Sequence, residues 1–219
     1  MNSREEILGR VRAGLQRNAT NAAAGRAVMA AALSSNSQGP KPAFDASSQA
    51  LLERFRIKSE VQASTVDVVA TDADVPAATA RYLSGMKLPK TAVVQPALAS
   101  LDWAAAGLTV EARGARDADL VGITGCFCAV AETGTLMMCS APDTPAAVSL
   151  LPETHVAVVH AARIVAYMED AWNLARAELG TLPRAVNFIS GPSRTGDIEQ
   201  TIVLGAHGPY RVHLLVVQG

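Results

Sequence analysis

The segment 191–199 carries the side chains best suited to binding an anion. Between an apolar strand and an expected helix start it holds two hydroxyls, a guanidinium and two carboxylates, on Ser193, Arg194, Thr195, Asp197 and Glu199. A guanidinium grips a carboxylate or phosphate through paired hydrogen bonds, and a helix N-terminus presents free N–H groups to the same anion. Ligands of α/β sheets bind outside the carboxyl ends of the strands, where we expect this segment. A simple capping loop is the alternative, and the guanidinium favours the anion site.

The segment 205–209, Gly-Ala-His-Gly-Pro, sets His207 between two glycines before the last expected strand. An imidazole, with a usual pKa of about 6.5, can transfer a proton or orient a carboxylate, and Gly208 lets a ligand approach the backbone closely. A structural histidine bonded to a backbone carbonyl is the alternative, and the sequence leaves the two evenly matched. The remaining histidines stand in apolar strands and are assigned to core or surface positions: His155, His160 and His213.

A third polar cluster, Glu132, Thr133, Gly134 and Thr135, lies at a turn between two apolar strands. Burial there would raise the pKa of the Glu132 carboxyl unless a partner such as Arg194 compensated. In one interpretation Glu132 is a nucleophile or base in a pocket. In the other, which the residues alone favour, it accepts backbone hydrogen bonds in a hairpin turn.

These clusters together define a composite site at one edge of a sheet. Its predicted catalytic residues are Glu132, Asp197 and His207. Its predicted ligand-binding residues share hydroxyl, guanidinium, carboxylate or glycine chemistry: Thr133, Gly134, Thr135, Ser193, Arg194, Thr195, Glu199 and Gly208.

No metal or cofactor site is predicted in this chain. Of the three cysteines, Cys126 and Cys128 are too close for an ordinary disulfide, and Cys139 has no histidine at ligand spacing beside it. We therefore expect reduced cysteines that pack as small hydrophobic residues. Glycine-rich nucleotide loops, a nucleophile elbow and the His-Glu-x-x-His zinc motif are all absent from the sequence.

Alternating elements must position these residues. The periodicity predicts helices over 2–17, 49–58, 75–86, 98–106, 164–179 and 197–204, and strands over 65–70, 91–95, 108–112, 120–123, 127–131, 135–140, 155–160, 186–190 and 211–217. Strands that alternate with helices are typical of a parallel sheet, while the short middle strands favour antiparallel or mixed pairing. The predicted fold is α/β: a single sheet flanked by helices over 49–219, with an N-terminal helical appendage and linker over 1–48.

Composition bounds the function. The 219 residues are 49% hydrophobic and 18% charged, enough for one core of ordinary size. The formal net charge of -1 gives no field to attract nucleic acid or an anionic membrane surface. Apolar stretches fall short of the roughly 20 residues of a membrane span, and no signal-peptide pattern opens the chain. We expect a cytoplasmic protein.

In order along the chain, Ile123-Thr124-Gly125, residues 131–135, Ser149-Leu150-Leu151-Pro152 and the segments 191–199 and 205–209 closely resemble the lactate utilization protein C family, which carries the LUD domain. The resemblance implies a fold like that of ribose-5-phosphate isomerases and CoA transferases. It also implies work beside two iron–sulfur proteins that oxidise L-lactate to pyruvate. The iron–sulfur clusters are then expected in the partner proteins, since this chain lacks four cysteines at usable spacing.

The leading hypothesis is a component of that system, which binds a small anionic ligand or supports a redox partner. Two alternatives stay open. One is an enzyme in its own right, acting on a carboxylate, a CoA ester or a sugar phosphate, with Glu132 as nucleophile or base; it rests on analogy of fold. The other is a structural assembly subunit, with the first helix as its docking element.

Overall fold

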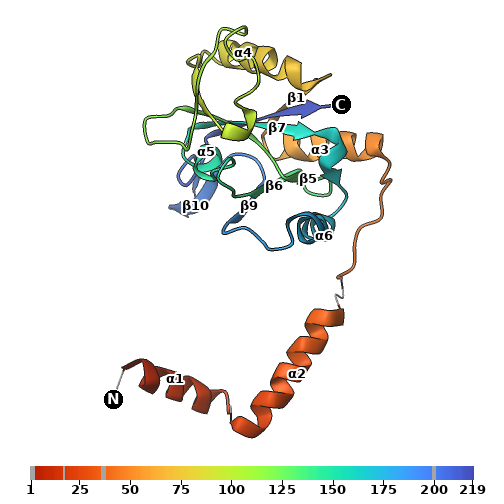
Figure 1. Ribbon diagram of the computed structural model, residues 1–219, viewed down its shortest axis with the longest axis vertical. Helices are drawn as coiled ribbons and strands as arrows, with labels where there is room; N and C mark the ends of the chain where they lie inside the picture. Colours follow the sequence, from red (N-terminus) through yellow and green to blue (C-terminus); the bar gives the residue numbers. More distant parts are fainter. Residues whose placement is uncertain (1–2, 17, 36–37, 199–200) are drawn as a thin grey trace. The chain divides into compact units, whose positions relative to one another are not determined.

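The structure, a computed structural model, describes residues 3–16, 18–35, 38–198 and 201–219. The chain divides into two units, Met1–Pro42 and Ala43–Gly219. The first contains the helices α1 (Ser3–Gly14) and α2 (Ala19–Ser35), drawn in red and orange in Figure 1. The sequence analysis drew its boundary at residue 48, the start of the next helix. The candidate site lies in the second unit.

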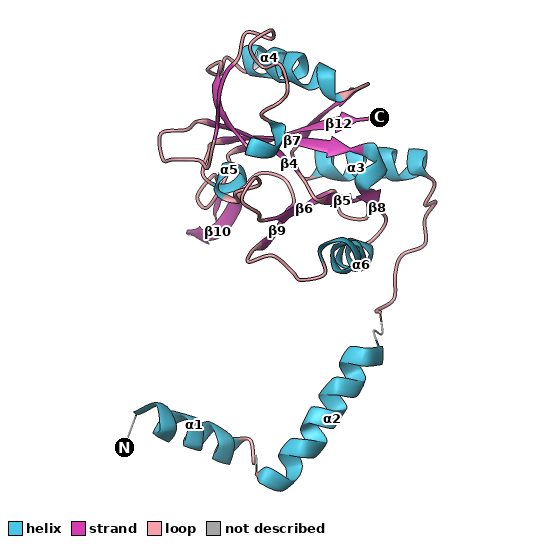
Figure 2. Ribbon diagram, viewed as in Figure 1, coloured by secondary structure: helices cyan, strands magenta, loops and turns pink. Residues whose placement is uncertain are grey.

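A six-stranded parallel sheet forms the centre of the second unit (Figure 2). Its order is β1-β12-β7-β4-β2-β3. Its strands are β1 (Thr65–Val69), β2 (Thr91–Val94), β3 (Thr109–Ala112), β4 (Val121–Gly125), β7 (Thr154–His160) and β12 (Arg211–Val217). The longest pairing joins β12 to β7, from Arg211↔Thr154 to Val217↔His160. Nearly continuous apolar runs such as Val212–Val217 suit a central parallel strand, which is buried on both faces.

A second, mixed sheet has the order β8-β5-β6-β9. Its strands are β5 (Cys128–Val130), β6 (Thr135–Cys139), β8 (Ile164–Val165) and β9 (Val186–Ile189). The β5–β6 pair is antiparallel, as the middle section of the sequence predicted. The strands β10 (Arg194–Ile198) and β11 (Thr201–Leu204) pair as a separate antiparallel ribbon. The α/β prediction is confirmed for the mostly parallel central sheet and its flanking helices. Of the three predicted middle strands, β5 and β6 join β8 and β9 in the second sheet, whereas β4 pairs in parallel within the central sheet.

Helices alternate with the two sheets in layers. They are α3 (Ser48–Val61), α4 (Val75–Gly85), the short α5 (Ala147–Leu150) and α6 (Met168–Leu179). On one face of the central sheet α4 packs against Ile123, Val156 and Leu215. On the other face α3 lies between the two sheets, and α6 covers the far side of the second sheet.

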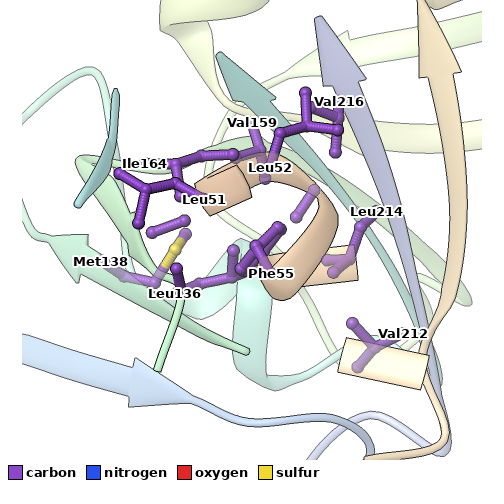
Figure 3. Packing of buried hydrophobic residues seen from close by; sticks show 13 residues of the cluster. Leu51, Leu52, Phe55, Leu136, Met138, Val159, Ile164, Val212, Leu214 and Val216 are labelled. Atoms are coloured by element: carbon purple, nitrogen blue, oxygen red, sulfur yellow. The ribbon is translucent and has the colours of Figure 1, made fainter. Parts of the chain in front are cut away.

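The core between the sheets is centred on α3 (Figure 3). Phe55, fully buried, packs with Leu136 of the second sheet and Leu214 of the central sheet. Burying one such side chain contributes about 1.5–3 kcal/mol to stability. Because α3 holds both sheets, its C-terminal end also fixes the loops at that end of the molecule.

Two helices of the sequence analysis are wrong. In place of the helix predicted over 98–106, the structure has only the short 3-10 turn Pro96–Leu98. The helix does not form because the Trp103 Nε1 donates to the Leu98 carbonyl and the Asp102 carboxylate caps a local turn. In place of the helix predicted over 197–204, residues 197–198 belong to β10 and residues 201–204 form β11. Its β-branched residues, such as Thr201 and Val203, favour that extended form. The helix predicted over 164–179 begins only at Met168, because Ile164–Val165 forms β8.

Two further 3-10 turns complete the domain, Asp72–Asp74 and Ala161–Arg163. Asp72–Asp74 leads directly into α4, and Ala161–Arg163 directly into β8. The second of these turns places Arg163 beside Phe127, a contact that shapes a cavity described below.

Candidate functional site

The two loops around Ser193 and His207 meet. The backbone N–H of His207 donates to the Ser193 Oγ over 3.3 Å. The backbone N–H of Ser193 donates to the Pro209 carbonyl, and the N–H of Gly205 donates to the Ser193 carbonyl, each over 2.9 Å. Ser193 therefore ties the start of the β10–β11 pair to the loop that precedes β12. Its hydroxyl accepts from a backbone group, as in the capping interpretation, but it caps a loop and no helix.

Arg194 binds the end of α3. Its Nη2 donates to the backbone carbonyl of Gln62, the C-cap residue of α3, over 2.9 Å, while the side chain stays exposed. A cation at a helix C-terminus is favourable because the free carbonyls there carry partial negative charge. The guanidinium thus has one backbone acceptor and keeps donors for a further partner.

The turn that carries Glu132 packs against the same end of α3. Gly134 has φ +69°, and a Cβ atom on it would lie 2.5 Å from the backbone nitrogen of Ser59. The Ser59 hydroxyl donates to the Gly134 carbonyl over 3.4 Å. Thr135 and Ser190 hydroxyls lie 2.7 Å apart, which links this turn to the segment that leads into β10. The turn around Glu132 and the loop of Arg194 therefore converge at α3.

Convergence of the turns does not extend to every predicted side chain. Glu132 donates its backbone N–H to the Ala166 carbonyl, and no ion pair joins its carboxylate to Arg194, both residues being described. Thr133 bonds to Thr135 over 2.7 Å. Thr195 pairs with Val203 in the β10–β11 register, and Asp197 lies on β10. Glu199, predicted to bind ligand, lies outside the described residues.

This site lies at the amino edge of the central sheet, where we had expected the carboxyl edge. Pro209 stands two residues before β12 begins at Arg211, and Gln62 stands three residues before β1 begins at Thr65. The expectation was wrong because the segment 191–199 follows β9, which belongs to the second sheet and runs antiparallel to its neighbour. The rule for the carboxyl ends of parallel strands therefore does not apply to it.

The buried histidines occupy core positions, as their apolar strands indicated. His155 is fully buried on β7, and its Nε2 lies 2.7 Å from the Thr124 Oγ1 of β4. Burial lowers the pKa of His155 to about 4. His213 stacks on Tyr82 with ring centroids 3.8 Å apart, and its pKa is also lowered to about 4, chiefly by burial. Both stay neutral at pH 7 and hold the core together, so neither joins the site.

The three cysteines are free thiols. Cys128 is fully buried in the core under α6, as expected. Cys126 and Cys139 are half-buried and line a cavity, which the sequence did not indicate. Burial raises the pKa of Cys126 to about 12. Within the described ranges no three His, Cys, Asp or Glu side chains gather closely enough to hold a metal ion.

The cavity of about 550 Å³ opens at the carboxyl edge of the central sheet. Its lining includes Gln95, which directly follows β2, Cys126, which directly follows β4, and His160, the last residue of β7. This site was not predicted from the sequence because none of these residues stands in a glycine-rich polar motif. The signal that could have found it was positional: the residue that ends each parallel strand.

Comparison with known proteins identifies the family. The family model of the LUD domain matches residues 52–217, which include both sheets and both edges described above. The chain belongs to the LUD domain family. The predicted resemblance is thereby confirmed.

Relatives of this LUD domain protein include lactate utilization protein C of Bacillus subtilis, 39% identical over 100 residues, or 44% of this chain and 42% of that protein. Lactate utilization protein C of Bacillus licheniformis is 33% identical over 120 residues, 53% of this chain and 50% of that one. These matches thus span about half the length of the curated relatives. A DUF162 family protein from Deinococcus radiodurans has a similar structure, with a TM-score of 0.62, 26% identity and coverage of 79% of this chain and 99% of that one.

The helices of the described ranges are all too short or too polar to cross a membrane.

Proposed function

We propose that this LUD domain protein is a cytoplasmic component of an L-lactate utilization system, in which L-lactate is oxidised to pyruvate together with iron–sulfur partner proteins. The observation that carries the proposal is the kinship with relatives named lactate utilization protein C, at 33–40% identity over about half of each chain. The matched LUD domain, residues 52–217, contains every loop of the amino-edge site.

The amino-edge site is proposed as the place where this protein meets a small anionic ligand or a redox partner. Arg194 is exposed and uses one donor on Gln62, so that its remaining N–H groups can bind a carboxylate in paired fashion. His207 is exposed as well, and its backbone N–H donates to Ser193, the residue that precedes Arg194. In this proposal Glu132, Asp197 and His207 handle protons.

The other predicted residues are proposed to shape the site. Gly134 allows close approach of the α3 backbone, and Gly208 leaves room for the Ser193 side chain. The Thr133–Thr135 hydroxyl pair fixes the turn around Gly134. The remaining proposed ligand contacts are hydroxyl or carboxylate groups of the loop and ribbon: Ser193, Thr195 and Glu199.

The iron–sulfur clusters are assigned to the partners. A cluster of the common type needs four cysteine ligands, and the sequence has three cysteines in all. Cys128 is moreover buried among apolar side chains under α6. The chain's own contribution is then binding and orientation, with the electrons carried elsewhere.

The two alternatives differ in what they require of this site. An enzyme in its own right needs substrate turnover by the isolated chain, with Glu132 as nucleophile or base. A structural subunit needs complex formation that survives loss of the polar side chains in the loops.

Co-purification tests the proposal. The tagged chain is expressed with the two iron–sulfur lactate utilization proteins, and the retained iron is measured. We expect retention by the wild-type protein and by Arg184→Ala, an exposed arginine away from the site. Arg194→Ala is expected to retain several-fold less iron if the loop contacts a partner, or equal iron with lost lactate oxidation if it binds the ligand. Failure of the wild-type chain to retain iron or to support lactate oxidation would contradict the proposal.

A further inference from the structure

The cavity at the carboxyl edge lies at the other end of the central sheet from the amino-edge site. Its volume, about 550 Å³, falls within the range of roughly 300–1,000 Å³ that is usual for small-molecule sites. Its walls come from the ends of β2, β4 and β7, from the β6 residues Met138 and Cys139, and from the end of α6. Five separate elements of the fold therefore enclose one space.

Gln95 presents an oriented hydrogen-bond donor to this cavity. The residue is buried by the surrounding protein, with an exposed fraction of 2%. The Oε1 atom accepts the backbone N–H of Gly125 over 3.0 Å, which fixes the direction of the amide group. No acceptor in the described part of the chain bonds to its Nε2. The Gln95 Nε2 is not among the fully buried side-chain atoms that lack a partner, and Gln95 lines the cavity, so its N–H groups are left to donate to a molecule there.

The charges around the cavity disfavour an anion. Among the described residues Arg163 is the one arginine in the wall. Each of its three nitrogens already donates: Nε to the Phe127 carbonyl, and Nη1 and Nη2 to the Glu178 carboxylate at 2.6 and 2.9 Å. Asp143 adds a further carboxylate to the wall. His160 is engaged with Asp72 over 2.9 Å. A lactate or phosphate ion would thus meet more negative charge than available positive charge.

Most of the rest of the wall is apolar and polarisable, and Ser140, Thr144 and Thr181 add hydroxyl groups to it. Phe127, Met138 and Leu179 contribute an aromatic ring, a thioether and an aliphatic chain. The thiols of Cys126 and Cys139 lie there too, and burial raises the pKa of both above that of a free cysteine, so they stay protonated and uncharged at pH 7. Such sulfur-rich walls make favourable contacts with aromatic rings.

We propose that this cavity binds an uncharged, mainly apolar small molecule with a ring and a carbonyl group, whose oxygen accepts a hydrogen bond from the Gln95 amide. The walls supply the contacts for the ring, and Gln95 supplies the orientation. The inference goes beyond the amino-edge site and does not depend on it.

A pair of matched probes tests the proposal. The first is 2,3-dimethyl-1,4-naphthoquinone, whose methyl groups block addition of a thiol to the ring, and the second is 2,3-dimethylnaphthalene, which lacks the carbonyls. Equilibrium dialysis of the full chain should show one binding site for the quinone. The affinity for the hydrocarbon should be at least about tenfold lower, because a well-placed hydrogen bond usually contributes about that factor to binding. L-lactate and inorganic phosphate should not displace the quinone.

Variants locate the site. Ala141→Trp fills the rim of the cavity at an exposed position, and it should abolish quinone binding. Ala105→Trp, at another exposed alanine that does not line the cavity, should bind like the wild type. Gln95→Leu should lower the quinone affinity about tenfold and make the two probes bind equally.

Clear results would overturn the inference. These are no saturable binding of the quinone to the wild type, equal affinity for both probes, unchanged binding by Ala141→Trp, or displacement of the quinone by lactate or phosphate. If Gln95→Leu fails to fold, the two probes on the wild-type chain still decide the role of the hydrogen bond. Arg194→Ala should bind the quinone normally, so failure of the amino-edge proposal leaves this result unaffected.

Discussion

Thr124 and His155 are joined by a hydrogen bond of 2.7 Å between β4 and β7, the two central neighbours of the parallel sheet. The imidazole is fully buried, and its Nδ1 has no partner among the described residues. Burial holds the pKa of His155 at about 4, so that the folded protein keeps this ring neutral. The stability of the core therefore depends on pH.

Acid should destabilise the fold through this histidine. In the unfolded chain His155 has its usual pKa of about 6.5 and binds a proton that the folded state excludes. The contribution of His155 to the free energy of unfolding is thus complete above about pH 6.5. It falls as the pH drops toward 4, by up to about 1.4 kcal/mol per pH unit. Urea titrations between pH 7 and 5 should show a shallower fall for His155→Gln than for the wild type.

Thr124→Val is the control for that titration. It removes the hydrogen bond without removing the titrating ring, so it should lower stability at every pH and keep the wild-type slope. An identical slope in His155→Gln and the wild type would show that this imidazole is not buried as described.

Gly134→Ala should destabilise the protein strongly. The residue has φ +69°, and its added Cβ would lie 2.5 Å from the Ser59 nitrogen and 2.6 Å from the Lys58 carbonyl carbon. Gly107 has the similar φ of +73° with nothing within 4 Å, so Gly107→Ala costs only the backbone strain of about 1–2 kcal/mol. Calorimetry should show a melting temperature for Gly134→Ala several degrees below that of Gly107→Ala. Equal losses would mean that the turn does not rest on α3.

The strands could be predicted because their composition is local information. Short apolar runs such as Val212–Val217, and valines at every second position such as Val156 and Val158, indicate buried strands. This signal is the same whichever strand lies beside them. The choice of sheet could not be predicted, because β9 has the same apolar pattern whether it joins the central sheet or pairs with β6. The ribbon of β10 and β11 was mistaken for a helix because its charged residues follow a glycine, a pattern that also suits a helix start.

The site was predicted in part for a related reason. Ser193 and His207 stand near glycines that mark tight loops, and the structure brings those loops together. The edge on which they lie depends on the direction of β9, which is a long-range property. Gln95 was missed because its importance comes from burial and from Gly125, 30 residues away.

Arg194→Ala should leave the fold nearly intact. The contact with the Gln62 carbonyl is exposed, and such a contact contributes about 0–1 kcal/mol, so the melting temperature should fall by no more than about 4 °C. Lactate-dependent activity in the reconstituted system should fall at least about tenfold, since loss of a charged ligand partner costs about 2–5 kcal/mol of binding. Arg184→Ala should match the wild type in both measurements. Unfolding of Arg194→Ala would instead identify a structural residue.

The purified chain should be colourless and free of stoichiometric metal. Cys128 is buried under α6, and the described residues contain no cluster of three suitable ligands. Elemental analysis for iron and zinc, on wild type and on the Cys126→Ser/Cys128→Ser double variant, measures this. About one metal ion per chain, lost in the double variant, would overturn the assignment of these cysteines to packing.

The most direct measurement of the proposed function is lactate oxidation by the two iron–sulfur partner proteins with and without this chain. Pyruvate formed from L-lactate is followed in the presence of an artificial electron acceptor, at equal partner concentrations. The account predicts that the rate rises with added chain until the complex is saturated, and that the chain alone forms no pyruvate. Equal rates with and without the chain would contradict its place in lactate utilization.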